Sequence, residues 1–273
     1  MRETHALRTS HGLIWVEQSG RGELPVLMIH GNSSCLEVFR RQIDGPLARQ
    51  NRLIAFDLPG HGRSGDAIDP ARTYTLPGYA DVSREILSLL AIEEVVVLGW
   101  SLGGHIALEM MQEFSRAKGL VLVGTPPVGP DTFSKGFRPS PHFKLAAEAK
   151  WSDADVERFG HAVFDEAFSP DLKTALVRAD GIARSTLFEA RRAGVGADQR
   201  KLVESLTMPI AVLNGAEDPF INLDYLLDSI SFKNLWRGQC QRIVGAGHAP
   251  FLQKPTVFNE ISNEYLAELA NHR

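Results

Sequence analysis

Short apolar runs alternate with amphipathic stretches along most of the chain. The runs are apolar on both faces, which is typical of parallel strands that are covered on two sides. They predict strands at 26–30, 53–57, 95–100, 120–124, 210–214 and 241–244. Helical spacing of apolar residues predicts helices at 76–90, 102–114 and 256–269. This alternation favours an α/β fold with a mostly parallel sheet and helices on both faces.

The first residues follow a different pattern. Residues 5–9 and 13–17 flank the short polar sequence Ser10-His11-Gly12. Two such runs around a tight turn predict an antiparallel hairpin. We therefore expect the otherwise parallel sheet to begin with a hairpin.

The alternation stops between residues 126 and 200. Prolines open this stretch, and two helical patterns follow at 152–164 and 170–188, the first with Ser152 as N-cap and Asp155 at N3. Seven of the 14 phenylalanines fall here, at positions 133, 137, 143, 159, 164, 168 and 188. We expect residues 1–125 and 201–273 to form the core and residues 126–200 a helical lid. The rings then either cover an apolar cavity or only glue the lid to the core.

Composition narrows the classes of protein to which the chain can belong. The chain has 273 residues, of which 44% are hydrophobic and 23% charged, with a net charge of −4. These values are ordinary for a globular protein and do not favour nucleic acid as a partner. Two cysteines, Cys35 and Cys240, favour a reducing compartment, so we expect a cytoplasmic protein. No signal peptide or membrane-spanning run is visible, and the sequence predicts no oligomeric state.

Residues 99–103 carry the strongest chemical signal. They read Gly-Trp-Ser-Leu-Gly, which matches G-x-S-x-G between a predicted strand and a predicted helix. On such a sharp turn, side chains two positions either side of the serine would collide, and glycine avoids this. We therefore predict Ser101 as a nucleophile, exposed at the carboxyl end of the sheet.

A serine nucleophile needs a base, and the base needs an orienting acid. His248 lies in a Gly- and Pro-containing loop after the last predicted strand, and has the right chain order. Glu217 and Asp218 follow the strand at 210–214. We favour Asp218 because Pro219 fixes the chain there and because the corresponding position serves in related folds. Glu217 remains the alternative.

The loop after the strand at 26–30 is expected to complete an oxyanion hole. One donor would be the N–H of Leu102, and the other the N–H of Asn32. The Asn32 side chain either bonds a substrate carbonyl, caps the following helix, or does both. Cys35, close by, is expected to be a small buried thiol rather than a reactive one.

The sequence gives little support to two other kinds of site, a dinucleotide site and a metal site. Residues 60–65 spell G-x-G-x-x-G after a strand, but the loop expected at 66–70 argues against a dinucleotide site. No two histidines have the i,i+2 or i,i+4 spacing of metal ligands, and H-E-x-x-H is absent. We therefore expect neither a cofactor nor a metal.

These motifs together resemble the α/β-hydrolases over nearly the whole chain. The resemblance rests on the hairpin and the His30-Gly31 loop, on residues 57–64 and 99–104, and on Asp218 and His248. Shorter strings are similar to the metal-independent N-acyl-homoserine lactonases of this fold. They lie at 28–34, 66–70, 99–105, 124–128, 180–184, 234–236 and 247–251. That family can carry Glu as the acid, where this chain has Asp218.

The resemblance implies a serine hydrolase that opens the lactone ring of quorum-sensing signals through an acyl-enzyme. A small ester or lactone with an apolar acyl chain is the expected partner, contacting Asn32, Gly31, Trp100 and Phe159. One alternative is a general carboxylesterase or another acyl hydrolase of the same fold. Others are a hydrolase-like ligand receptor and a metal-dependent lactonase.

Overall fold

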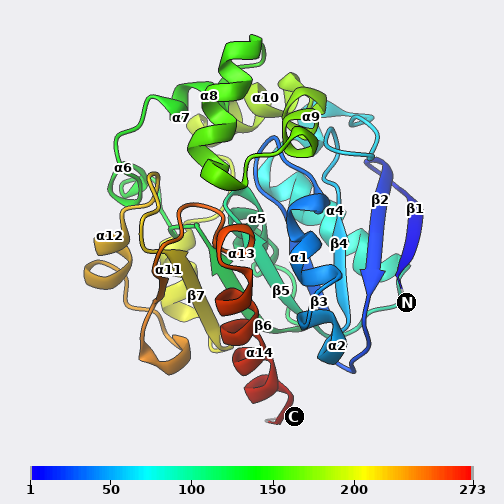
Figure 1. Cartoon of the computed structure of the whole chain (residues 1–273), viewed down its shortest axis with the longest axis vertical. Coiled ribbons are helices and arrows are strands. Elements are labelled where there is room, and N and C mark those ends of the chain that lie inside the picture. The colour runs from blue at the N-terminus through cyan, green and yellow to red at the C-terminus, as the bar shows by residue number, and fades with distance from the viewer. Residues whose placement is uncertain (1, 272–273) are drawn as a thin grey trace.

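Eight strands form one sheet in the order β1-β2-β4-β3-β5-β6-β7-β8 in this computed structural model, which describes residues 2–271 (Figure 1). The strands are β1 Glu3–Thr9, β2 Gly12–Ser19, β3 Val26–Ile29, β4 Leu53–Phe56, β5 Val95–Trp100, β6 Ala117–Val123, β7 Ile210–Gly215 and β8 Gln241–Ile243. β1 and β2 pair antiparallel, as does β2 with β4, whereas β4, β3 and β5–β8 run parallel. The N-terminal hairpin and the α/β-hydrolase fold are thus confirmed.

Helices cover both faces of the sheet (Figure 1). One face carries η1 Leu36–Phe39, α1 Arg40–Ile43, α2 Leu47–Gln50, α13 Pro250–Gln253 and α14 Pro255–Asn271. The other carries α3 Pro70–Thr73, α4 Leu76–Leu89, α5 Leu102–Met110 and α11 Gln199–Ser205. β3, β4 and β5 are buried along their whole lengths, which explains why their sequences are apolar at every position.

Four helices lie together beyond the carboxyl ends of the strands and are called the cap helices below (Figure 1). They are α7 His142–Ala147, α8 Asp153–Phe164, α9 Pro170–Arg178 and α10 Gly181–Arg192. Ser152 and Asp155 form a capping box at the start of α8, as predicted. Short elements complete the chain: α6 Phe133–Gly136, η2 Asp165–Ala167, α12 Leu223–Asp228 and η3 Trp236–Gly238.

Several predicted boundaries are wrong, and three of them change an element near the site. The helix predicted at 170–188 is two helices, because Asp180 leaves helical geometry and its side chain accepts the Ile182 N–H to start α10. α5 ends at Met110 rather than at residue 114. The loop expected at 66–70 ends in a short helix at Pro70, where the Asp69 side chain accepts the Arg72 N–H.

The division into a core and a lid at residues 126 and 200 stays a prediction. Helix α11 crosses the second of these boundaries. Within residues 2–271, no helix combines the length and the apolar character needed to cross a membrane.

Candidate active site

Ser101 sits on the sharp turn between β5 and α5. Its backbone has φ 54° and ψ −117°, a region that non-glycine residues rarely adopt. A Cβ at Gly99 would lie 2.3 Å from the carbonyl oxygen of Gly103, and a Cβ at Gly103 would lie 2.0 Å from that of Ile29. Only glycine fits at either position, which confirms the steric prediction from the G-x-S-x-G motif.

His248 and Asp218 lie in contact below the cap helices. Nδ1 of His248 is 2.8 Å from Oδ2 of Asp218, whose side chain is 0% exposed. The other carboxylate oxygen accepts the N–H groups of Phe220 (2.8 Å) and Ile221 (3.2 Å). Glu217 is exposed instead. Of the two acids that the sequence left open, the geometry therefore favours Asp218.

The segment after β6 brings Ser101 and His248 to the same place. The Ser101 N–H donates to the carbonyl of Val123 (2.8 Å), and Thr125 Oγ1 donates to the carbonyl of Ser101 (3.0 Å). Between them, a Cβ at Gly124 would lie 2.9 Å from Cε1 of His248. Among the described residues, no hydrogen bond joins Ser101 Oγ to the imidazole. Such bonds are often long in free enzymes and shorten with substrate.

Trp100 supports the histidine from below. Its indole N–H donates to the carbonyl of His248 (2.7 Å), and its ring packs against His248, Phe164 and Phe251. With only 1% of Trp100 exposed, the indole holds the His248 loop in place. Its predicted contact with substrate stays a prediction.

The loop at 31–34 packs directly on the Ser101 turn. A Cβ at Gly31 would lie 3.0 Å from the Trp100 ring and 3.2 Å from Cβ of Ser101, so the absent side chain permits this approach. His30 fixes the next peptide: its Nε2 accepts the Leu58 N–H (3.0 Å), so Nδ1 donates to the carbonyl of Gly31 (2.8 Å). In a trans peptide the Asn32 N–H then points the opposite way.

A second buried histidine holds Ser33, which also has a positive φ, 56°. The Ser33 N–H donates to Nε2 of His61 (3.2 Å), and Nδ1 of His61 donates to the carbonyl of Pro59 (3.0 Å). Burial lowers the pKa of His30 to about 3 and that of His61 to about 4. Both rings are therefore neutral at pH 7 and can each accept one backbone N–H.

The Asn32 side chain does not cap a helix, contrary to one expectation. The N-cap of η1 is Cys35, which makes no side-chain capping bond. Instead, Asn32 Nδ2 donates to the carbonyl of Ala146 in α7 (2.9 Å), which joins the loop to the cap helices. Leu102, the other predicted donor, is the first residue of α5, where backbone N–H groups lack partners within the helix.

Aromatic rings from residues 126–200 approach His248 through Phe220. Phe143 packs on Phe220 (centroids 6.0 Å apart), and Phe220 packs edge-on against His248 (4.9 Å). Phe159 is 6% exposed and packs on Trp151 (4.8 Å) in the cap helices. Substrate contact by Phe159 and by Gly31 therefore stays a prediction, as does a cavity beneath the rings.

The G-x-G-x-x-G loop serves the fold around Asp57. This buried carboxylate accepts the N–H groups of Leu36 (2.7 Å) and Arg63 (2.8 Å), and a Cβ at Gly62 would lie only 2.3 Å from it. Burial raises the pKa of Asp57 to about 6, and raises the pKa of Cys35 to about 12. Cys35 thus remains a protonated thiol at neutral pH, as a buried residue should.

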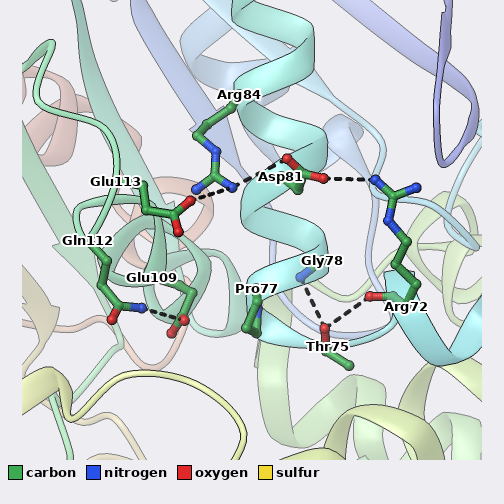
Figure 2. A pocket seen from close by; sticks show the side chains of 9 residues that line it. All are labelled: Arg72, Thr75, Pro77, Gly78, Asp81, Arg84, Glu109, Gln112 and Glu113. Atoms are coloured by element: carbon green, nitrogen blue, oxygen red, sulfur yellow. Dashed lines mark hydrogen bonds and ion pairs between the residues drawn. The ribbon is translucent and has the colours of Figure 1, made fainter.

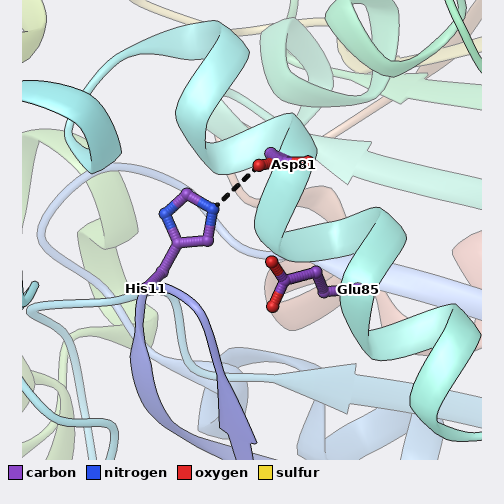
Figure 3. A group of neighbouring side chains, drawn as sticks. All are labelled: His11, Asp81 and Glu85. Carbon is purple, nitrogen blue, oxygen red and sulfur yellow. Dashed lines mark hydrogen bonds and ion pairs between the residues drawn. The ribbon is translucent and has the colours of Figure 1, made fainter.

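Two polar clusters lie outside this site. His11, Asp81 and Glu85 have the spacing of a metal site (Figure 3), but Arg72 Nη2 lies 3.2 Å from His11 Nε2 and 2.9 Å from Asp81 Oδ2. The positive charge of the Arg72 side chain thus already pairs with Asp81 in this cluster. A pocket of about 300 Å³ lies between α4 and α5 (Figure 2), and its charged walls pair with one another. No member of the Ser101, Asp218 and His248 set lines it.

Comparison with known proteins agrees with this arrangement. Residues 26–261 match the alpha/beta hydrolase family. The chain belongs to this family. It is 42% identical to the N-acyl homoserine lactonase AidH in a crystal structure with N-hexanoyl homoserine lactone, with a TM-score of 0.96, covering 98% of this chain and 99% of that one.

More distant α/β-hydrolases match along the whole length as well. A 2-hydroxy-6-oxononadienedioate/2-hydroxy-6-oxononatrienedioate hydrolase from Pseudomonas sp. is 24% identical over 94% of this chain and 93% of its own. An esterase from Rhodococcus sp. is 21% identical with a TM-score of 0.81, covering 98% of this chain and 99% of that one, which shows the shared fold. This chain is thus a hydrolase by family.

Sequence reasoning missed the residues that support the 31–34 loop. The sequence suggests Ser33 only as a helix cap beside Asn32 and gives His61 no role. It places Arg184 only in a string that resembles the lactonases. His30 and His61 do carry a signal, because each directly precedes a glycine in a loop after a strand. No local pattern pairs either one with its backbone partner.

Proposed function

We propose that this chain opens the ring of N-acyl-homoserine lactones with Ser101 as nucleophile. The observation that carries the proposal is the whole-chain similarity to a lactonase, at 42% identity and a TM-score of 0.96. That relative has been crystallised both with a lactone and with N-hexanoyl homoserine. The contact between Asp218 and His248 supports the same chemistry here.

The geometry suggests how the proton would move. A carboxylate only accepts hydrogen bonds, so Asp218 keeps the imidazole proton of His248 on Nδ1 and leaves Nε2 free to accept. His248 would take the Ser101 proton as Oγ attacks the lactone carbonyl. It would then return the proton to the leaving alkoxide, and water would hydrolyse the acyl-enzyme.

The N–H groups of Leu102 and Asn32 would hold the oxyanion that forms during attack. One such donor contributes roughly 3–4 kcal/mol to transition-state stabilisation. The packed rings of Phe143 and Phe220 would face the acyl chain of the substrate. Each buried CH₂ group there would add about 0.8 kcal/mol to binding.

The test follows a homoserine lactone by mass and by pH. N-Hexanoyl homoserine lactone is incubated near neutral pH with wild type and with Ser101→Ala. Wild type should add one water to the lactone and release acid, and Ser101→Ala should lose at least about 10⁴-fold of this rate. Ser88→Ala, on the exposed face of α4, is the matched control and should keep full activity.

Other outcomes assign other functions. Hydrolysis of aryl esters with no opening of any lactone in a chain-length series would identify a general carboxylesterase. Tight lactone binding without turnover would identify a receptor. Equal lactonase activity in wild type and Ser101→Ala would contradict the serine mechanism.

A further inference from the structure

Arg184 on α10 is a buried cation whose hydrogen bonds all go to neutral groups in the described residues. Only 4% of the side chain is exposed. Nε donates to the carbonyl of Glu148 (2.8 Å) and Nη2 to that of Ala149 (3.1 Å), while the guanidinium lies 4.1 Å from the Trp151 ring centroid. No carboxylate in residues 2–271 accepts a hydrogen bond from Arg184, and burial lowers its pKa to about 10 although the Asp180 carboxylate lies near enough to oppose this. A buried charge held in this way costs stability, so a stabilising role alone does not explain this residue.

One bond of Arg184 leaves the cap helices. Nη1 donates to Oγ of Ser33 (3.2 Å), which in turn donates to Oδ1 of Asn32 (3.3 Å). Asn32 closes the circuit through its bond to the carbonyl of Ala146. The loop at 31–34 is thus attached to the cap helices at two adjacent side chains.

This attachment acts on a strained part of the backbone. Ser33 has a positive φ, which costs free energy and persists only where surrounding contacts hold it. The preceding residue supplies the N–H that we assign to the oxyanion hole. An error of about 1 Å in such a donor can cost about 100-fold in rate.

We propose that Arg184 is a positioning residue, which docks the cap helices onto Ser33 and thereby aims the Asn32 N–H at the oxyanion. The inference rests on the proposed function, because it assumes an oxyanion at this place. His30 already orients the Gly31–Asn32 peptide, and the Asn32 N–H would reach its full alignment with the oxyanion only while the cap helices are docked. Acylation would then be fast only with the cap closed over the substrate.

A second arginine provides a matched control. Arg178 on α9 also ties the cap helices to the core, through the carbonyl of Ser64 (2.9 Å) and Oδ1 of Asp66 (3.0 Å). It also donates to the carbonyl of Gly60 (3.5 Å), and within residues 2–271 it makes no hydrogen bond or ion pair with the 31–34 loop. Substitution of either arginine should therefore loosen the attachment of the cap helices. Only substitution of Arg184 should also displace the oxyanion donor.

The experiment compares binding of a transition-state analogue with binding of a ground-state ligand. Butylboronic acid forms a tetrahedral anionic adduct on a nucleophilic serine, and N-hexanoyl homoserine is the ring-opened ligand. Inhibition constants are measured for wild type, Arg184→Gln, Ser33→Gly, the double variant and Arg178→Gln. Ser33→Gly removes one hydroxyl and tolerates the positive φ, so it remains folded if Arg184→Gln does not.

We expect Arg184→Gln and Ser33→Gly each to weaken boronate binding about 10- to 100-fold and to lower kcat similarly. In these two variants, KM and the binding of N-hexanoyl homoserine should change less than about threefold. In Arg178→Gln, kcat, KM and both inhibition constants should all change less than about threefold. The double variant should match the single ones, because both break one connection.

Three results would overturn the inference. The first is unchanged boronate binding in both single variants, and the second is additive losses in the double variant. The third is an equal loss in Arg178→Gln, which would reduce Arg184 to general cap attachment. If wild type neither binds the boronate nor hydrolyses lactone or ester, the proposed function itself fails, which is a distinct outcome.

Discussion

Two serines in the candidate site have backbone torsions that serine rarely adopts, and they are held in opposite ways. At Ser101, φ is 54°, and the turn is fixed by glycines two positions away and by a backbone bond to Val123. At Ser33, φ is 56°, and side chains hold the residue: His61 accepts its N–H and Arg184 donates to its hydroxyl.

The two serines differ in how far along the chain the residues that hold them lie. The glycines that permit the Ser101 turn lie within residues 99–103, and its distant partners are backbone groups of neighbouring strands, Val123 and Ile29. The partners of Ser33 lie 28 and 151 residues away. We therefore expect the Ser101 turn to be insensitive to side chains far away in the sequence, whereas the loop at 31–34 depends on the cap helices and on the buried rings of His30 and His61.

The largest expected effect concerns the local side of the comparison. In Asp218→Asn, the amide oxygen can still accept the N–H of Phe220, but the amide nitrogen would face the His248 Nδ1–H. The imidazole then turns or changes tautomer, and kcat should fall about 10⁴-fold with little change in stability. Steady-state kinetics and thermal unfolding check this.

Glu217→Gln is the control for that substitution. Its carboxylate is exposed, so activity should stay within about twofold of wild type. A larger loss in Glu217→Gln than in Asp218→Asn would reverse the assignment of the acid.

The same contrast explains how much the sequence could predict. The strands, the hairpin and the turn at Ser101 follow from local patterns: apolar runs, a polar turn and two glycines at fixed spacing. The two adjacent acids could not be separated by any local rule. Only the fold shows that Asp218 faces inward and Glu217 outward.

The remainder depends on long-range contacts. The break between α9 and α10 follows from Asp180, whose N–H donates to the carbonyl of Gly60 and whose carboxylate bonds Tyr74. The Asn32 side chain has a partner 114 residues away. Neither partner can be inferred from spacing, because the sequence does not show which loops meet.

The second prediction disrupts the turn at Ser101 by adding one methyl group. In Gly103→Ala, the new Cβ would overlap the Ile29 carbonyl in the centre of the sheet, where the backbone cannot move away. Unfolding free energy should fall by about 3 kcal/mol or more. Gly65→Ala is the control, because its Cβ would meet nothing closer than 3.5 Å, and it should cost less than about 1 kcal/mol. Equal costs in denaturant unfolding would contradict the steric account.

The third prediction uses pH to test the buried histidines that hold the loop at 31–34, together with His105. His30, His61 and His105 have folded pKa values of about 3, 4 and 4, below the ordinary 6.5, because burial disfavours their charged forms. The stability they contribute is present above pH 6.5 and is lost as pH falls toward those values. From pH 7.5 to 5.5 the three should lose roughly 4 kcal/mol together.

Asp57 opposes this loss. Its pKa is raised from 3.8 to about 6, so protonation on acidification returns roughly 1 kcal/mol, leaving a net loss of about 3 kcal/mol. Urea unfolding at the two pH values measures it. His105→Gln, which removes the one histidine of the three that lies on α5, should reduce the loss to about 2 kcal/mol. A pH-independent midpoint would show that these rings are not held neutral.

The smallest effect is a difference of sign between the two serines. Ser101→Gly should raise the unfolding free energy by about 1 kcal/mol, because it relieves a disfavoured torsion and the hydroxyl has no hydrogen-bond partner in the described residues. Ser33→Gly relieves a similar torsion but removes the bonds to Arg184 and Asn32, so it should lower stability by about 1 kcal/mol. Urea unfolding of both variants measures the difference. If both substitutions stabilise the protein, the network at Ser33 does not hold the loop, and the two serines are held alike.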